Sequence, residues 1–342
     1  MKRILALILA LTLTLSVAVL AGCSKEETAP TEATAAEETA AEETATVEPS
    51  APLTLSSFTA TAGEYELTFE PVEIGTLKGT DSTHDFTGDY YDGRYYLSDI
   101  EGKIIYVFTI DGTTASLEDK FEMDSTYEKI SVSPDGDVYL SPGIFEAVIM
   151  DDDGSVEKTD YRHDVEWARD EDFAITTWVN SDPMIIEDGE ESEWVFKNLN
   201  DDETREGNLA MVFDCEIAGE KIIIGGNYKE NDEESYRIGV YDFDGEELAL
   251  TDVEDSVGYP ALNATENGII SANVNSIYLH DMDCKPIGEI KNLRTLAGLD
   301  DSVNTFWVKE FSVAEDGSIY MLVYASRPDE TKEAILYRIT GF

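Results

Sequence analysis

From residue 53 onward, short apolar runs rich in Val, Ile, Tyr and Phe alternate with tight Asp-Gly and Asn-Gly turns. This alternation is typical of antiparallel strands joined by hairpins. No stretch of that region has the apolar spacing of three and four residues that an amphipathic helix requires. The pattern therefore predicts an all-β domain.

The strand pattern repeats along the chain. ISVSPDGDVYLS (Ile130–Ser141) resembles FSVAEDGSIYML (Phe311–Leu322), and the same strand–turn–strand skeleton recurs in four further places. The first turn of each repeat falls at Asp92, Asp135, Glu171, Ala218, Asn267 and Asp316. A second tight turn follows in several repeats, so each unit contains four strands in about 45 residues. Six such units predict a β-propeller with six blades.

The two ends of the repeat region complement each other. The last repeat has only three strands, whereas YELTFEPVEIGTL (Tyr65–Leu77) is strand-like and precedes the first repeat without a partner. Pairing this segment with the last repeat removes two exposed strand edges, which would otherwise favour aggregation. We therefore predict a six-bladed β-propeller of four-stranded antiparallel blades over residues 63–342, with the last blade closed by an N-terminal strand.

Over Tyr65–Phe342 the blade pattern resembles the six-bladed propellers of the NHL and TolB-like groups. The resemblance implies the fold but no particular chemistry, because many functions share it. Gluconolactonase-type enzymes of this family use a Glu, an Asn and an Asp around a divalent metal in the central channel. We assign no residues of this sequence to those three positions.

The amino end predicts where the protein is located. Lys2 and Arg3 precede an apolar run, and Leu20-Ala21-Gly22-Cys23 resembles a bacterial lipobox. The resemblance implies that residues 1–22 are a signal peptide and that Cys23 carries lipid on the extracytoplasmic face of the cell membrane. An uncleaved membrane helix is the alternative. Residues 23–62, rich in Ala, Thr, Glu and Pro after the Cys, predict a flexible tether.

The charge of the chain restricts its partners. With 23 Lys and Arg against 73 Asp and Glu, the formal net charge is −50. Such a charge repels phosphates, so a nucleic-acid partner is excluded. The hydrophobic content of 42% is enough for a large core. We expect the domain to be monomeric. Whether Cys215 and Cys284 are bonded to each other remains open.

Candidate binding residues gather where loops connect second to third strands and one blade to the next. We call the side with these loops the top face, and the side with the tight turns the bottom face. Aromatic, imidazole and guanidinium groups in these loops suit flat polar ligands such as sugars or peptides. Plugging of the channel or capping of the blade tops is the alternative role. The candidates are His84, Asp85, Tyr127, Arg162, His163, Tyr259, Arg294 and Trp307.

Two acidic turns suggest calcium. They contain Asp151 with Asp153, and Asp242 with Asp244, at spacings seen in some calcium loops. Neither turn has the complete loop motif, and Asp-Gly is also what a hairpin turn requires. We predict no cofactor, with Ca²⁺ at these turns as the alternative.

Together these features predict a lipid-anchored, extracytoplasmic, non-catalytic binding module whose top face engages a protein or glycan ligand. One alternative is an enzyme acting in the channel, either a metal-dependent lactonase or a glycan hydrolase or lyase. Another is a structural component of an envelope assembly. The segment Gly226–Tyr236 is expected to form a long loop on the top face of the fourth blade.

Overall fold

The computed structural model describes residues 53–342, apart from 80–84, 144, 163, 169–172, 178–183, 188–189, 194–207, 231–232 and 254–260. Residues 49–342 belong to one compact unit. Among the described residues, no helix is long and apolar enough to cross a membrane.

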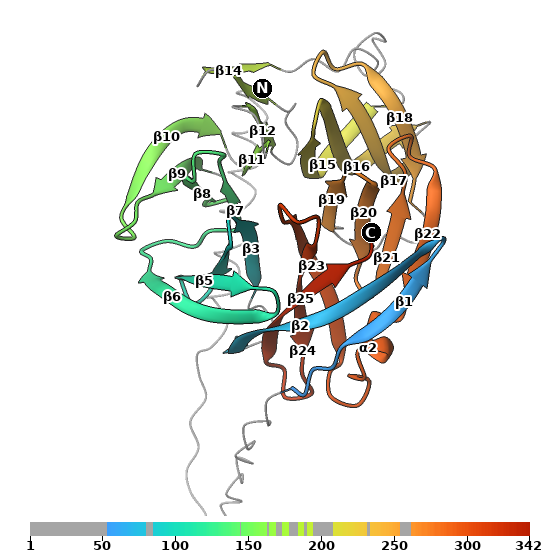
Figure 1. Ribbon diagram of the computed structural model, residues 1–342. Coiled ribbons are helices and arrows are strands. Elements are labelled where there is room, and N and C mark those ends of the chain that lie inside the picture. Colours follow the sequence, from blue (N-terminus) through green and yellow to red (C-terminus); the bar gives the residue numbers. More distant parts are fainter. Residues whose placement is uncertain are drawn as a thin grey trace, which may run out of the picture. The chain divides into compact units, whose positions relative to one another are not determined.

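Six antiparallel sheets surround a central axis, which confirms the predicted propeller (Figure 1). In blades one to five, the four strands follow one another in chain order. Blade one contains β3 (Phe86–Tyr91), β4 (Arg94–Asp99), β5 (Ile104–Asp111) and β6 (Thr114–Glu122), and blade two contains β7 (Lys129–Val132), β8 (Val138–Ser141), β9 (Glu146–Met150) and β10 (Val156–Arg162). Blade three contains β11 (Asp164–Trp167), β12 (Phe173–Thr177), β13 (Met184–Glu187) and β14 (Glu190–Glu193), and blade four contains β15 (Asn208–Ala218), β16 (Lys221–Glu230), β17 (Glu233–Asp242) and β18 (Glu247–Asp252). Blade five contains β19 (Ala261–Thr265), β20 (Gly268–Asn273), β21 (Ser276–His280) and β22 (Pro286–Lys291).

Blade six joins the two ends of the chain. It has the order β1-β2-β25-β24-β23, and β2 pairs with β25 through contacts such as Phe69 opposite Ile339. The prediction that an N-terminal strand completes this blade is therefore confirmed. A fifth strand, β1, extends the propeller into residues that the sequence assigned to the tether. The strands are β1 (Phe58–Ala62), β2 (Tyr65–Lys78), β23 (Thr305–Val313), β24 (Ile319–Ser326) and β25 (Lys332–Thr340).

The N-terminal hairpin, formed by β1 and β2, also contacts both neighbouring blades. On one side β1 packs against β22 of blade five. The approach is so close that a Cβ atom on Gly288 would lie 2.3 Å from the backbone nitrogen of Gly63. On the other side, the Glu73 N–H donates a hydrogen bond of 3.1 Å to the Thr113 carbonyl of blade one. The hairpin thus links three consecutive blades.

The inner strands close the ring around the axis. Each of β3, β7, β11, β15, β19 and β23 contacts the next, and β23 contacts β3. At five junctions in the described part of the chain, an inner-strand side chain also hydrogen-bonds to the backbone of the following blade. The pairs are Asp89 with Val132, Ser131 with Trp167, Asp214 with Leu262, Asn263 with Phe311, and Glu310 with Gly88. These bonds supplement the apolar packing between blades, which supplies most of the buried core.

The two faces differ as the sequence predicted. The first turns at Asp92, Asp135, Ala218, Asn267 and Asp316 lie between first and second strands, while the turn at Glu171 lies outside the described residues. The short helix α2 (Leu293–Leu296) is in the loop between blades five and six, on the top face, and contacts β1. Leu53 and Leu55 pack against the hydrophobic cluster that includes Leu293. Because β1 runs from the top face toward the bottom face, the chain enters the propeller at the top.

One prediction for blade four is wrong. The segment expected to form a long top loop instead continues the hairpin of β16 and β17, whose pairing extends to Glu230 opposite Glu233. Elsewhere, Cys215 and Cys284 are both buried and free, so they form no disulfide.

Candidate functional site

Five of the predicted site residues have no described side chain, namely the lipidation site and four of the ligand-binding candidates. Cys23, His84, His163 and Tyr259 lie outside the described residues, and Arg162 is described only as the last backbone position of β10. The structure therefore places Asp85, Tyr127, Arg294 and Trp307 among the top-face candidates.

Two of these residues hold local structure. Tyr127 is only 3% exposed and packs in the apolar cluster between blades one and two. Its carbonyl accepts a hydrogen bond from the Ser98 hydroxyl at 3.0 Å. Arg294, on α2, donates to the Asn304 carbonyl at 2.8 Å and to an Asp300 carboxylate oxygen at 3.1 Å. These hydrogen bonds fix the loops in which Tyr127 and Arg294 lie.

The other two predicted residues meet at the top of blade six. Trp307 on β23 is directly opposite Tyr324 on β24, and their rings stack with centroids 5.7 Å apart and planes 28° apart. Lys309 Nζ lies 2.8 Å from Asp85 Oδ2 and 5.5 Å from the Tyr324 ring centre. Lys332 Nζ lies 4.2 Å from the same ring centre. We call these five residues the top-face cluster.

A β-bulge directs Lys309 into this cluster. The register between β23 and β24 shifts so that Val308 and Glu310 pair with consecutive residues of β24, and Lys309 is the extra residue. A bulge of this kind changes the direction of the side chains around it. The cluster is accessible, because about a quarter of the Lys309 and Asp85 side chains is exposed and Trp307 is only partly buried.

The phenol of Tyr324 stays neutral in this setting. Burial raises its pKa well above the usual range, and the nearby Asp85 carboxylate raises the pKa further. The two lysines beside the ring therefore interact with an uncharged aromatic face. The top-face cluster thus combines a stacked aromatic pair, two ammonium groups and one carboxylate on three paired strands and the start of blade one.

The channel beyond the cluster is filled by polar groups that satisfy one another. Lys129 Nζ lies 3.0 Å from Asp214 Oδ1 and 3.3 Å from Glu166 Oε2. Burial lowers the pKa of Lys129, but the negative charges of Asp214 and Glu166 raise it by more. The lysine pKa is therefore held well above its ordinary value. Nearby, Asn263 donates to Glu216 at 2.7 Å and to the Phe311 carbonyl at 2.9 Å. These contacts bind the blades together at the axis.

Glu310 faces the same channel next to blade one. It accepts hydrogen bonds from the Gly88 N–H at 2.6 Å and from the Thr87 hydroxyl. Removal of its carboxyl from bulk water raises the pKa to about 8, although both hydrogen bonds act in the opposite direction. Glu310 is thus a carboxyl that is largely protonated near neutral pH.

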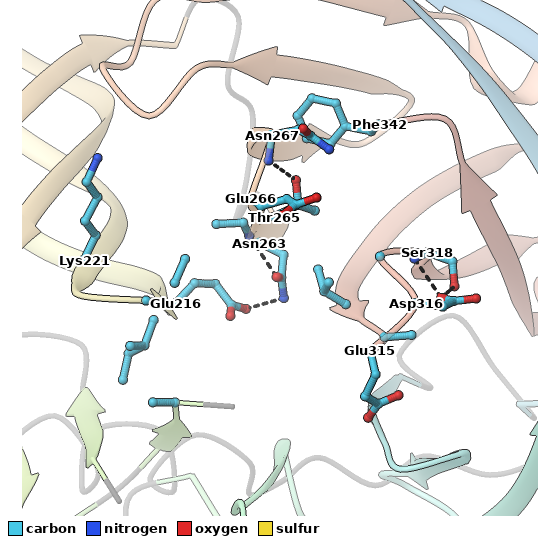
Figure 2. A pocket seen from close by; sticks show the side chains of 18 of the residues that line it. Glu216, Lys221, Asn263, Thr265, Glu266, Asn267, Glu315, Asp316, Ser318 and Phe342 are labelled. Atoms are coloured by element: carbon cyan, nitrogen blue, oxygen red, sulfur yellow. Dashed lines mark hydrogen bonds between the residues drawn. The ribbon is translucent and has the colours of Figure 1, made fainter. Parts of the chain in front are cut away.

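A cavity of about 1240 Å³ opens on the bottom face among the first turns (Figure 2). Glu216 and Asn263 lie at its centre, joined by their hydrogen bond. Trp167 and Phe342 line it, but they are only 6% and 8% exposed, so their rings offer little surface for stacking. The ligand-binding face predicted from the sequence is the opposite one, and no sequence motif indicated this cavity.

The charge of the cavity lining follows the composition of the chain. Among the described residues that line it, six carry carboxylates and two, Lys221 and Arg338, are cations. This proportion matches the 73 acidic and 23 basic residues of the whole sequence.

The acidic turns considered for calcium are hydrogen-bonded within themselves. Asp151 accepts a bond from the Ser155 hydroxyl, and Asp153 accepts one from the Ser155 N–H. Asp242 accepts a bond from the Glu246 N–H at 2.8 Å, and Asp244 lies in the same turn. Among the residues that the structure describes, no group of three or more His, Cys, Asp or Glu side chains is placed to hold a metal ion.

Comparisons with known proteins show the fold. No protein-family model matches the sequence, and comparison with curated proteins finds no match. A luciferin-regenerating enzyme of solved structure is 13% identical, with a TM-score of 0.50 over 78% of this chain and 96% of that one. A chain of a mitotic checkpoint complex is 11% identical, with a TM-score of 0.46 over 76% of this chain and 93% of that one. BamB from Moraxella catarrhalis is 9% identical, with a TM-score of 0.39 over 82% and 93% of the respective chains.

Proposed function

We propose that the protein is a lipid-anchored, extracytoplasmic binding module, without catalytic activity, whose top face engages a protein or glycan ligand. The top-face cluster is the observation that carries this proposal. Its partly exposed Trp307, the ion pair of Lys309 with Asp85, and Lys332 form a mixed aromatic and charged surface. Strands hold all but one of these side chains, so little ordering is needed when a ligand binds.

A glycan and protein binding screen of the full-length protein tests the proposal. Trp307→Ala removes the exposed member of the aromatic pair. Phe145→Ala is the matched control, because Phe145 lies in a top-face loop of blade two and is 61% exposed. We expect Trp307→Ala to weaken binding of the captured ligand at least tenfold, with no change for Phe145→Ala. Equal binding by both variants and the parent protein would show that the cluster is not the site.

The membrane anchor is tested separately. The lipobox resemblance at Leu20–Cys23 supports lipidation of Cys23. We expect Cys23→Ser to abolish incorporation of a labelled fatty acid and to release the protein from the membrane fraction of cells. Retention of the label in Cys23→Ser would contradict the assignment.

A further inference from the structure

We infer that the ligand of the top-face cluster is an anionic glycan, namely one whose sugars carry carboxylates. The inference rests on the proposed function and names the chemistry of its ligand. It follows from the placement of two lysines beside one aromatic pair in a chain of net charge −50.

The two lysines are not equivalent. Asp85 pairs with Lys309 and also accepts a hydrogen bond from the Phe86 N–H through its second oxygen. Asp85 therefore fixes Lys309 and offsets its charge. Lys332 contacts the Tyr324 ring and makes no ion pair within 4 Å to any described residue. Among the described residues the ammonium group of Lys332 is thus without an ion-pair partner, and we assign it to a carboxylate of the ligand.

The aromatic pair favours a sugar ring over an extended acidic peptide. Tyr324 is only 9% exposed and lies under Trp307 and the lysines, so the partly exposed indole provides the contact surface. A flat indole packs well against the C–H face of a pyranose ring. Lys332 is diagonal to Tyr324 across the β24–β25 pair, so a carboxylate on the stacked sugar can meet its ammonium group.

The net charge of the protein predicts an unusual salt dependence. At about 0.01 M salt the Debye length is about 30 Å, so the acidic surface repels an anionic glycan. At about 0.15 M it falls to about 8 Å, and charges in direct contact dominate. At about 1 M the contact with Lys332 is screened as well. We therefore expect affinity to be highest at intermediate salt.

The experiment measures binding of an oligogalacturonate hexamer to the full-length protein by calorimetry at 0.15 M NaCl. A neutral galactan hexamer and poly-glutamate are the comparison probes. We expect Lys332→Gln to weaken hexamer binding about fivefold, as the loss of one partly exposed ion pair predicts. Lys158→Gln, at an exposed lysine of β10 on another blade, is the matched control and is expected to bind normally.

Each outcome decides the inference. Preferential binding of the uronate, weakened by Lys332→Gln, supports it. Equal binding of the neutral hexamer would overturn recognition of the carboxylate while keeping the proposed binding of glycans. Preference for poly-glutamate would identify a peptide ligand and overturn the glycan assignment. Binding of none of the probes would overturn the inference, and the screen with Trp307→Ala would still test the proposed function by itself.

Discussion

Lys309 and Glu310 are consecutive residues of β23, yet both side chains bind blade one. Lys309 Nζ lies 2.8 Å from Asp85 Oδ2, and Glu310 accepts a hydrogen bond of 2.6 Å from the Gly88 N–H. Consecutive side chains of a regular strand point to opposite faces. The bulge at Lys309 removes that restriction. One irregularity therefore supplies both an element of the top-face cluster and a bond that closes the ring.

The protonation of Glu310 predicts a specific pH dependence of stability. Its folded-state pKa of about 8 exceeds the ordinary value of 4.5. The protonated carboxyl therefore contributes stability that is complete below pH 4.5 and is lost as the pH rises through 8. We expect Glu310→Gln to unfold at a temperature about 2–4 °C above that of the parent at pH 9, and to lose this advantage toward pH 5. Thermal melts of both proteins from pH 5 to 9 test this, and a constant difference would contradict it.

The charge cluster around Lys129 predicts a large loss of stability when its cation is removed. Lys129→Met leaves the carboxylates of Asp214 and Glu166 together in the channel without their cation. We expect the free energy of unfolding to fall by about 3 kcal/mol. Lys285→Met is the control, since Lys285 pairs with Asp283 on the surface, and it should leave the urea midpoint unchanged. Equal urea midpoints for the two variants would show that the channel ion pairs are unimportant.

Because the N-terminal hairpin packs closely against β22, we expect one added methyl group in β22 to loosen β1. In Gly288→Ala the new Cβ would lie 2.3 Å from the backbone nitrogen of Gly63, so the hairpin must move away from β22. We expect a loss of about 1–3 kcal/mol and faster hydrogen exchange in β1. Glu289→Ala changes the exposed neighbouring residue and should leave β1 exchange as in the parent. Unchanged exchange in Gly288→Ala would disprove the packing.

The contact between Gly225 and Tyr236 predicts that a second substitution can restore stability lost through a first one. A Cβ on Gly225 would lie 2.2 Å from the Tyr236 hydroxyl oxygen, and the next neighbouring atoms are more than 3 Å away. We expect Gly225→Ala to lose about 1–3 kcal/mol of unfolding free energy. Adding Tyr236→Phe should restore part of that loss, since it removes the clashing atom. A double-mutant cycle from urea melts measures the coupling, and additive losses would refute it.

The two described thiols are expected to be unreactive in the folded protein. Cys215 is 1% exposed and Cys284 3% exposed. Burial, with the carboxylates of Asp281 and Asp283, raises the pKa of Cys284 to about 12, so almost no thiolate forms at pH 8. A thiol reagent should modify both residues only at the rate of unfolding. Rapid modification in native buffer would contradict their burial.

The propeller itself was predictable because its signals are local. Tight-turn residues and apolar alternation recur in each blade, and the lone segment at Tyr65–Leu77 matched the strand that the last blade lacked. Strand β1 was not predictable, since FTATA offers small and polar residues whose burial depends on Phe58 stacking on Phe69. The polar run after Gly226 indicated a loop, but backbone pairing with the facing strand keeps it extended.

The candidate site was predictable only in part. Asp85 and Trp307 were found from their positions in the repeat, and the structure pairs Asp85 with Lys309 and stacks Trp307 on Tyr324. Tyr324 and Lys332 depend on the register of three strands and on a bulge, neither of which leaves a sequence motif. The cavity on the bottom face likewise arises from turns of several blades that meet only when the ring closes.

The composition of blade six has a consequence for biosynthesis. Phe69 can pair with Ile339 only after 270 further residues have been synthesised. At ordinary rates of translation this takes roughly 15–50 s. Until then β2 can pair on one edge only, with β1 in the N-terminal hairpin. A nascent chain stopped at any point before β25 therefore carries a hairpin whose β2 edge is unpaired and prone to aggregation. Among the strands that the structure describes, the first to be synthesised are thus among the last to join the rest of their blade.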